Sequence, residues 1–337
     1  MTKKELPQIA LVGSESLMGR ELRDLLRDSI LGRKLKLLGT AEPGTAILTE
    51  EAGEPAVIGG WDDAELNASR VVLLAGGAEL SKKALDGVKP GPDSPVLVDL
   101  TRSLEDHPGA RLRAPQAEDD EDSSAGKLYV VAHPAAILSA VLLRRLAEAG
   151  EIRRAILTVF EPASERGMAG IEELQQQTVS LLSFKKQNTA IFDDQLAFNL
   201  LARFGEEAPL ALETIQEQIE RHTASLISRM RGVPMPSVRL LQAPVMHGYT
   251  VSAWVLFAER PDLARVAELL KADPLDYRPA GTTQPNPVGM AAQNGIAAGA
   301  LEQDRNEARA IWVHAAADNF RLVAENALGV MRGVLSA

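Results

Sequence analysis

The sequence has no cysteine among its 337 residues, which excludes disulfides, thiolate metal sites and catalysis by a thiol. It also has no excess of basic residues: 36 lysines and arginines stand against 46 aspartates and glutamates, and the net charge is -10. Nucleic acid and anionic membranes are therefore not expected partners, because both need clustered cations. No apolar run approaches the roughly 18 residues of a membrane span, and the N-terminal lysines precede a short apolar strand rather than a signal-peptide core. We expect a soluble, cytoplasmic protein.

Apolar residues make up 45% of the chain, enough for about two domains at this length. In the first part of the chain, short apolar runs alternate with helical patterns, which is typical of βαβ units around a parallel sheet. Helical spacing of apolar residues predicts a crossover helix after Gly19. The predicted strands are Ile9 to Val12, Leu35 to Leu38, Val71 to Leu74, Val96 to Val98 and Leu128 to Ala132.

Residues 103–127 interrupt this alternation. They include Pro108, Pro115 and an acidic run from Glu118 to Asp122. Because nothing in the sequence offers these carboxylates a partner, we predict a solvated, mobile loop rather than a cation site.

In the second half, the predicted strands are longer and more amphipathic. They comprise Ile156 to Phe160, Val238 to Leu241, Tyr249 to Phe257 and Ala310 to Val313. Helices are predicted over Ile171 to Leu182 and Leu212 to Met230. The apolar side of the first of these helices comprises Ile171, Leu174, Leu181 and Leu182. We expect a mixed α+β second domain, followed by a C-terminal helix that packs back on the first domain.

The segment GSESLMG, from Gly13 to Gly19, connects the first strand to the first helix. Backbone amides and a helix N-terminus can receive a pyrophosphate here, although two glycines also fit a tight turn that binds nothing. Glu42 follows the second strand, where a carboxylate can bind a ribose 2′-hydroxyl and would repel a 2′-phosphate. If a dinucleotide binds, NAD is therefore favoured over NADP. Glu15 argues against binding, because it brings negative charge close to the expected phosphates.

The segment VVAHPAAILSAV, Val130 to Val141, predicts the end of a buried strand followed by an apolar helix. A strand tip facing a helix N-terminus is a place where an enzyme can hold a nucleophile. Here the tip carries Ala135, Ala136 and Ile137, none of which can attack a substrate.

Five segments, in order and at compatible distances, resemble the aspartate-semialdehyde dehydrogenase family. That family carries a GATGxVG turn, an AGG loop, an NPNC nucleophile segment, a QAVSGAG strand end and a DNLRKG segment. The corresponding segments here are GSESLMG at 13, LAGGAEL at 74, AHPAAIL at 132, EPASERG at 161 and DNFRLV at 318.

The resemblance covers nearly the whole chain and implies an α/β fold. It implies a Rossmann-type dinucleotide-binding domain, residues 1–134 with 314–337, and an α+β substrate and dimerisation domain, residues 135–313. It also implies a homodimer and a small-molecule ligand in the cleft between the domains. The family's reaction is the reductive dephosphorylation of an acyl phosphate, in which a cysteine forms a thioacyl intermediate, a histidine moves the proton and NADPH gives the hydride.

By the same resemblance, no catalytic residue of the family is intact. The nucleophilic cysteine falls on Ala136 and the strand-end glutamine on Glu161. The substrate-binding arginine falls on Gln242 and the proton-shuttling histidine on Tyr249. The family's phosphate-binding lysine has no counterpart, because residues 205–230 contain no lysine. Without a sulfur atom no thioacyl enzyme can form.

The resemblance also implies the cofactor-binding positions. Ser16 replaces the middle glycine of the turn, and Glu42 replaces an arginine that helps to hold the NADP 2′-phosphate. These changes weaken dinucleotide binding or move it toward NAD. The full set of implied cofactor-binding residues is Gly13, Ser16, Gly19, Glu42, Gly76 and Asn319.

Other polar groups are expected near the inherited cleft, where they could support a different reaction. These are His133, His247, Tyr249, Glu161, Ser164 and Arg166. We interpret His133 as a polar packing residue and His247 as a solvated turn residue. No histidine has metal-ligand spacing with another ligand. The three tryptophans, Trp61, Trp254 and Trp312, are interpreted as core or interface anchors.

Three functions remain open. The first is a divergent semialdehyde dehydrogenase that keeps the fold, the dimer and NAD binding without the thiol chemistry. The second is an oxidoreductase with changed, non-covalent chemistry on another carbonyl substrate, in which Tyr249 or His133 moves the proton. The third is a non-catalytic subunit that pairs with an active paralogue.

Overall fold

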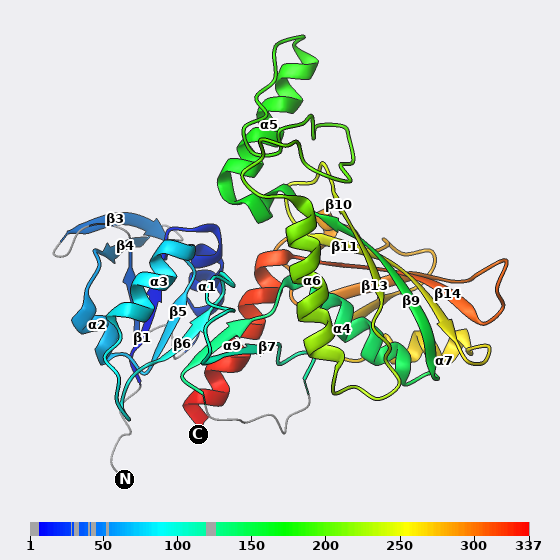
Figure 1. The fold of residues 1–337 in the computed structure, drawn as a ribbon, viewed down its shortest axis with the longest axis horizontal. Coiled ribbons are helices and arrows are strands. Elements are labelled where there is room, and N and C mark those ends of the chain that lie inside the picture. Colours follow the sequence, from blue (N-terminus) through cyan, green and yellow to red (C-terminus); the bar gives the residue numbers. More distant parts are fainter. Residues whose placement is uncertain are drawn as a thin grey trace. The chain divides into compact units, whose positions relative to one another are not determined.

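The computed structural model describes residues 7–27, 29, 34–39, 41, 45–51, 54–118 and 126–336. The chain forms two compact units, Met1–Ala132 with Val323–Ala337, and His133–Leu322 (Figure 1). The first unit resumes at Val323 rather than at the expected residue 314, because strand β14 (Ala310–Ala317) belongs to the sheet of the second unit. None of the described helices combines the length and the hydrophobicity needed to cross a membrane.

The first unit is built on an eight-stranded sheet with the order β3-β4-β2-β1-β5-β6-β8-β7. Its five central strands are those that the apolar runs predict, and all of them pair in parallel. Strands β1, β5, β6 and β8 are buried along their whole length, as expected for a parallel sheet covered on both faces. The strands are β1 (Ile9–Val12), β2 (Leu35–Leu38), β3 (Ala46–Glu51), β4 (Glu54–Gly59), β5 (Val71–Leu74), β6 (Val96–Asp99), β7 (Ala110–Arg113) and β8 (Leu128–Val131).

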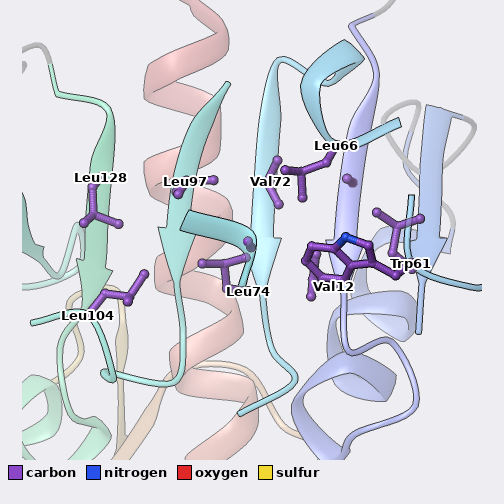
Figure 2. Packing of buried hydrophobic residues seen from close by; sticks show 11 residues of the cluster. Val12, Trp61, Leu66, Val72, Leu74, Leu97, Leu104 and Leu128 are labelled. Atoms are coloured by element: carbon purple, nitrogen blue, oxygen red, sulfur yellow. The ribbon is translucent and has the colours of Figure 1, made fainter. Parts of the chain in front are cut away.

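Helices α2 (Asp63–Ala68) and α3 (Ala78–Gly87) pack on one face of this sheet. Figure 2 shows their contact with the sheet as a layer of buried side chains that extends from Trp61 to Leu128. Trp61 is therefore a core residue, as one of the two interpretations from sequence has it. The crossover helix α1 (Leu17–Arg27) begins before Gly19 rather than after it.

The prediction of a mobile loop over residues 103–127 is wrong for the part that the structure describes. Residues Ala110–Arg113 form the edge strand β7, which pairs with β8. Leu104 is buried, and the Glu118 carboxylate accepts a hydrogen bond from Arg113 Nε at 2.7 Å. The rest of the acidic run, residues 119–122, lies outside the described residues.

The second unit contains a six-stranded, mostly antiparallel sheet with the order β10-β9-β11-β14-β13-β12. The strands predicted in the second half share this sheet, and Val251, Ala253 and Val255 form the buried side of β11. Besides β14, the strands are β9 (Ile152–Glu161), β10 (Ser237–Gln242), β11 (Tyr249–Phe257), β12 (Leu275–Arg278) and β13 (Ile296–Gln303).

Helix α4 (Pro134–Ala147) packs against the middle strands β9, β11 and β14 of this sheet. Helix α6 (Leu212–Ile227) packs on α4 in turn, and it ends three residues before the predicted Met230. The remaining helices are η2 (Ala163–Arg166), α5 (Gly167–Leu182), α7 (Leu263–Leu269), α8 (Pro287–Met290) and α9 (Asn319–Ser336). Helix α9 begins in the second unit and belongs to the first from Val323 onward.

Of the predicted apolar side of helix α5, only Leu174 is fully buried. The buried residues of the helix include Glu173 and Gln177, whereas Leu182 is 70% exposed. Glu173 accepts hydrogen bonds from the amides of Ile191 and Phe192, and Gln177 Oε1 accepts them from Leu196 and Ala197. The polar side chains are therefore buried because they satisfy the backbone of the following loop.

Candidate functional site

In the first unit, the turn from Gly13 to Gly19 lies directly against the loop after β5. Gly13 has φ +77°, and a Cβ on it would lie 2.0 Å from the Cα of Gly76. A Cβ on Gly19 would lie 2.3 Å from the Gly13 carbonyl oxygen. Three of the predicted cofactor-binding glycines are thus required by close backbone contacts, whether or not a ligand binds.

Ser16 holds this turn in place. Its hydroxyl donates to the Ala75 carbonyl oxygen at 2.7 Å and accepts from the Gly19 amide at 2.9 Å. The serine that replaces the family's middle glycine therefore caps helix α1 and ties the two loops together. One of the amides at the start of the helix is thereby used within the chain.

Other polar groups of the turn have no hydrogen-bond partner among the described residues. The amides of Leu17 and Met18 make no hydrogen bond to another described residue. The hydroxyl of Ser14 is fully buried and likewise has no partner in the described part of the chain. Helix amides without partners at the end of a buried strand fit a phosphate group. Glu42, the predicted ribose-binding residue, lies outside the described residues.

In the second unit, the segment that the resemblance aligns with the family's nucleophile forms the first turn of α4. His133 is the N-cap, its Nδ1 atom accepts a hydrogen bond from the Ala135 amide at 3.3 Å, and Pro134 occupies the first helical position. Ala135 and Ala136 are both completely buried. The helix terminus is therefore capped and packed, with methyl groups where the resemblance implies asparagine and cysteine.

A buried ion pair lies at the end of β9. Glu161 is fully buried, and its Oε1 atom accepts a hydrogen bond from Arg166 Nη2 at 2.9 Å. Burial lowers the pKa of Arg166, but the carboxylates of Glu161 and Glu165 and the nearby Tyr249 outweigh this effect and raise it. The glutamate at the family's glutamine position is thus matched by an arginine five residues later.

The other two predicted site positions are close to this pair. Gln242 ends β10 and donates from Nε2 to the Glu161 carbonyl oxygen at 2.8 Å, and its buried Oε1 atom has no partner among the described residues. Tyr249 begins β11, is fully buried, and meets the ring of His133 edge-on at 5.6 Å between centroids. The structure therefore brings the predicted catalytic positions of the second unit into one polar cluster.

Asn319, predicted to bind the cofactor, makes its hydrogen bonds within the second unit. Its Oδ1 atom accepts from the Gly248 amide at 3.0 Å. Its Nδ2 atom donates to Ser164 Oγ at 3.1 Å and to Glu165 Oε1 at 2.9 Å. The asparagine therefore joins the start of α9 to η2 and to the turn before β11.

Two members of the cluster are not predicted from the sequence. His222 on α6 is buried, and its Nδ1 atom accepts a hydrogen bond from the His133 amide at 2.9 Å. Glu165 lies 4.0 Å from His133 Nε2. Glu165 stands inside the matched segment EPASERG, but His222 has no motif around it and is brought to the site only by the packing of α6 on α4.

His247 is half-buried rather than fully solvated, and its ring meets that of Phe320 at 6.0 Å between centroids. Across the part of the chain that the structure describes, no three His, Asp or Glu side chains are grouped so that they could hold a metal ion. The cluster as a whole offers a buried guanidinium, two carboxylates, a phenol and two imidazoles. None of these groups is a thiol, so the cluster can bind, donate or accept protons but cannot form a thioester.

Comparison with known proteins agrees with the expected family. Residues 143–322 match the family described as semialdehyde dehydrogenase, dimerisation domain. An aspartate-semialdehyde dehydrogenase of Rickettsia bellii is 25% identical over 95% of this chain and 94% of its own length. A USG-1 protein homolog of Pseudomonas aeruginosa is 28% identical over 78% of each chain.

Solved structures show the same two-domain fold. A probable aspartate-semialdehyde dehydrogenase from Pseudomonas aeruginosa matches with a TM-score of 0.84 and 24% identity, over 98% of this chain and 99% of the other. An aspartate-semialdehyde dehydrogenase with NADP from Candida albicans matches with a TM-score of 0.64 and 12% identity, over 99% of both chains. The fold thus combines a Rossmann domain with a dimerisation domain.

Proposed function

Since the chain belongs to the semialdehyde dehydrogenase family, we propose that it is a dinucleotide-binding member that does not perform thiol-dependent reductive dephosphorylation. The observation that carries this proposal is Ala136, a buried methyl group at the start of α4 in a chain without cysteine. Loss of a covalent nucleophile costs on the order of a million-fold in turnover in a well-studied protease. Glu161, Gln242 and Tyr249 also differ from the residues that the family uses for the same reaction.

A dinucleotide fits the residues of the first unit. The amides of Leu17 and Met18 and the hydroxyl of Ser14 would hold its phosphates, and Gly13 and Gly76 allow the backbone to come close. A bound dinucleotide would supply hydride chemistry. We propose that NAD is bound in preference to NADP.

Two measurements on the purified chain test this function. We expect no reduction of NADP when aspartate semialdehyde and phosphate are supplied together, because no thioacyl enzyme can form. We also expect calorimetry to show NAD binding with a dissociation constant on the order of micromolar. Sustained, phosphate-dependent turnover would overturn the first statement, and no heat with either dinucleotide would overturn the second.

We further propose that the protein is a homodimer formed through the second unit. Ile156, Trp254 and Trp312 stand side by side across β9, β11 and β14 on the side opposite the buried residues of these strands. Ile156 is 42% and Trp312 is 44% exposed. An apolar row of this kind on a sheet is typical of a protein interface. Sedimentation analysis should find two copies, and association only with a different, active chain would favour the role of a partner subunit.

A second candidate function is supported by the position of Tyr249. Its phenol lies close enough to Arg166 to affect the pKa of that guanidinium, and its ring contacts His133. A phenol beside a cation can donate a proton to a carbonyl that receives a hydride, so a reductase without covalent catalysis is consistent with the cluster. Such an enzyme would lose turnover of its carbonyl substrate in a Tyr249→Phe variant while still binding NAD. Unchanged turnover in that variant would remove this candidate.

A further inference from the structure

The carboxylate of Glu15 lies at the end of strand β2. A carbon in the Cβ position of Gly39, the residue after β2, would lie 3.2 and 3.4 Å from the two carboxylate oxygens of Glu15. The same carbon would lie 2.9 Å from Ile58 Cγ2. The Glu15 carboxylate therefore lies close to the Cα of Gly39, where the side chain of a larger residue at position 39 would contact it.

The backbone on both sides of Glu15 is fixed. The Ser16 amide donates to the Gly13 carbonyl oxygen at 3.1 Å, and Arg20 Nε donates to the Glu15 carbonyl oxygen at 3.1 Å. Glu15 itself is half-buried, whereas Arg20 is exposed. Because the turn is held from both sides, the fold directs the glutamate toward the end of β2.

We infer that Glu15 selects a dinucleotide whose adenosine ribose carries no 2′-phosphate. In dinucleotide-binding folds, the end of the second strand is where a carboxylate binds the ribose 2′-hydroxyl. Here the glycine turn itself supplies a carboxylate to that strand end. A 2′-phosphate at the same place would meet a half-buried negative charge, which solvent screens less than an exposed one. The inference rests on the proposed dinucleotide binding.

The position of the Glu15 carboxylate also changes which part of a dinucleotide it would affect. In the sequence, its charge argues against a pyrophosphate, because it stands inside the phosphate-binding turn. In the structure, its carboxylate is beside Gly39, so it acts on the ribose rather than counting against all dinucleotides. Glu42 is a second carboxylate that would exclude a 2′-phosphate, and Arg20 is a cation that would attract one. The experiment therefore includes both residues.

The test compares two probes, ADP-ribose and ADP-ribose with a 2′-phosphate, by calorimetry on the full chain. We expect the unmodified chain to bind ADP-ribose roughly tenfold or more tightly than the phosphorylated probe. Glu15→Gln should bring the two affinities within about twofold of each other. Asp24→Asn, which removes an equal charge from an exposed position on α1, should leave the ratio unchanged. Glu15→Ala serves the same purpose if the glutamine variant is poorly folded by circular dichroism.

The other outcomes separate the inference from the function on which it rests. A ratio that is unchanged in both Glu15 variants, or that instead follows Glu42→Gln, overturns the role of Glu15 while leaving dinucleotide binding intact. Tighter binding of the phosphorylated probe that is lost in Arg20→Gln also overturns it. If the unmodified chain binds neither probe, both the proposed cofactor and this inference are removed.

Discussion

The side chains of the polar cluster in the second unit form ion pairs and hydrogen bonds mainly within that cluster. Glu161 pairs with Arg166, Gln242 donates to the backbone of Glu161, and Asn319 holds Ser164 and Glu165. In a medium of low polarity, such groups are costly when one partner is removed. The second unit is therefore sensitive to the loss of a single member of the cluster.

Removal of the guanidinium tests this sensitivity. Arg166→Met should lower the free energy of unfolding by about 3–5 kcal/mol, because it leaves the buried Glu161 carboxylate without its cation. The double variant Arg166→Met with Glu161→Gln should recover much of this loss, since it removes both charges. Urea unfolding followed by circular dichroism gives both values. If the double variant is less stable than the single one, the ion pair is not the source of the effect.

Restoration of the sulfur atom should not restore the reaction. By the correspondence that the resemblance implies, Ala136→Cys places a thiol at the family's nucleophile position, whereas Tyr249 replaces the proton-shuttling histidine and Gln242 the substrate-binding arginine. We expect no phosphate-dependent turnover of aspartate semialdehyde above that of the unmodified chain. A spectrophotometric assay of dinucleotide reduction measures it. Turnover in the single variant would mean that the remaining residues suffice.

The sequence predicts a helix or strand well where the local hydrophobic pattern alone determines it. Buried parallel strands such as β5 are continuous apolar runs, and they are predicted within a residue of their ends. Edge strand β7 has the sequence ARLR, which has no apolar run and depends on pairing with β8. On α5, apolar residues suggest a buried side, but the loop that follows needs the polar side chains of Glu173 and Gln177. These hydrogen bonds depend on how the loop folds back on α5, so the sequence of the helix alone does not predict them.

Strand β14 provides a prediction about pH. Burial holds the pKa of His314 below its ordinary value of 6.5. The unfolded chain therefore binds a proton at this residue more readily than the folded chain does. The contribution to stability is complete above about pH 6.5 and falls as the pH drops toward the folded-state pKa.

His314→Gln should therefore make the free energy of unfolding less dependent on pH between about pH 7 and about pH 5. Urea midpoints at several pH values measure this slope. A slope that is equally steep in the His314 variant would contradict the prediction.

For the chain in its entirety, the quoted motifs predict the family and the two-domain fold, because they are distributed from the first strand to the last helix. They contain two members of the polar cluster, Glu161 at the end of β9 and Asn319 at the start of α9. They miss His222, because a residue in the middle of α6 reaches the cluster only through helix packing. They also place the charge of Glu15 near the phosphates, since the direction of a side chain cannot be read from its position in a turn.

The proposed dimer predicts which surface mutation weakens self-association of the chain. Trp312→Glu places a charge in the apolar row of the second unit and should weaken self-association at least tenfold, because a buried unpaired charge opposes the interface. Leu48→Glu, on an exposed residue of β3 in the first unit, is the control. Sedimentation velocity over a range of concentrations distinguishes the two variants. Equal association constants would place the contact on another surface.

The indole nitrogens of Trp254 and Trp312 both donate to the same Asp304 oxygen, each at 2.9 Å. Two of the three tryptophans in the chain therefore share one environment on the open side of a sheet, while Trp61 is enclosed in the other unit. Dilution should dissociate the proposed dimer and expose these two indole rings to solvent, which should shift the tryptophan fluorescence to longer wavelength. Assembly can therefore be followed without an added dye.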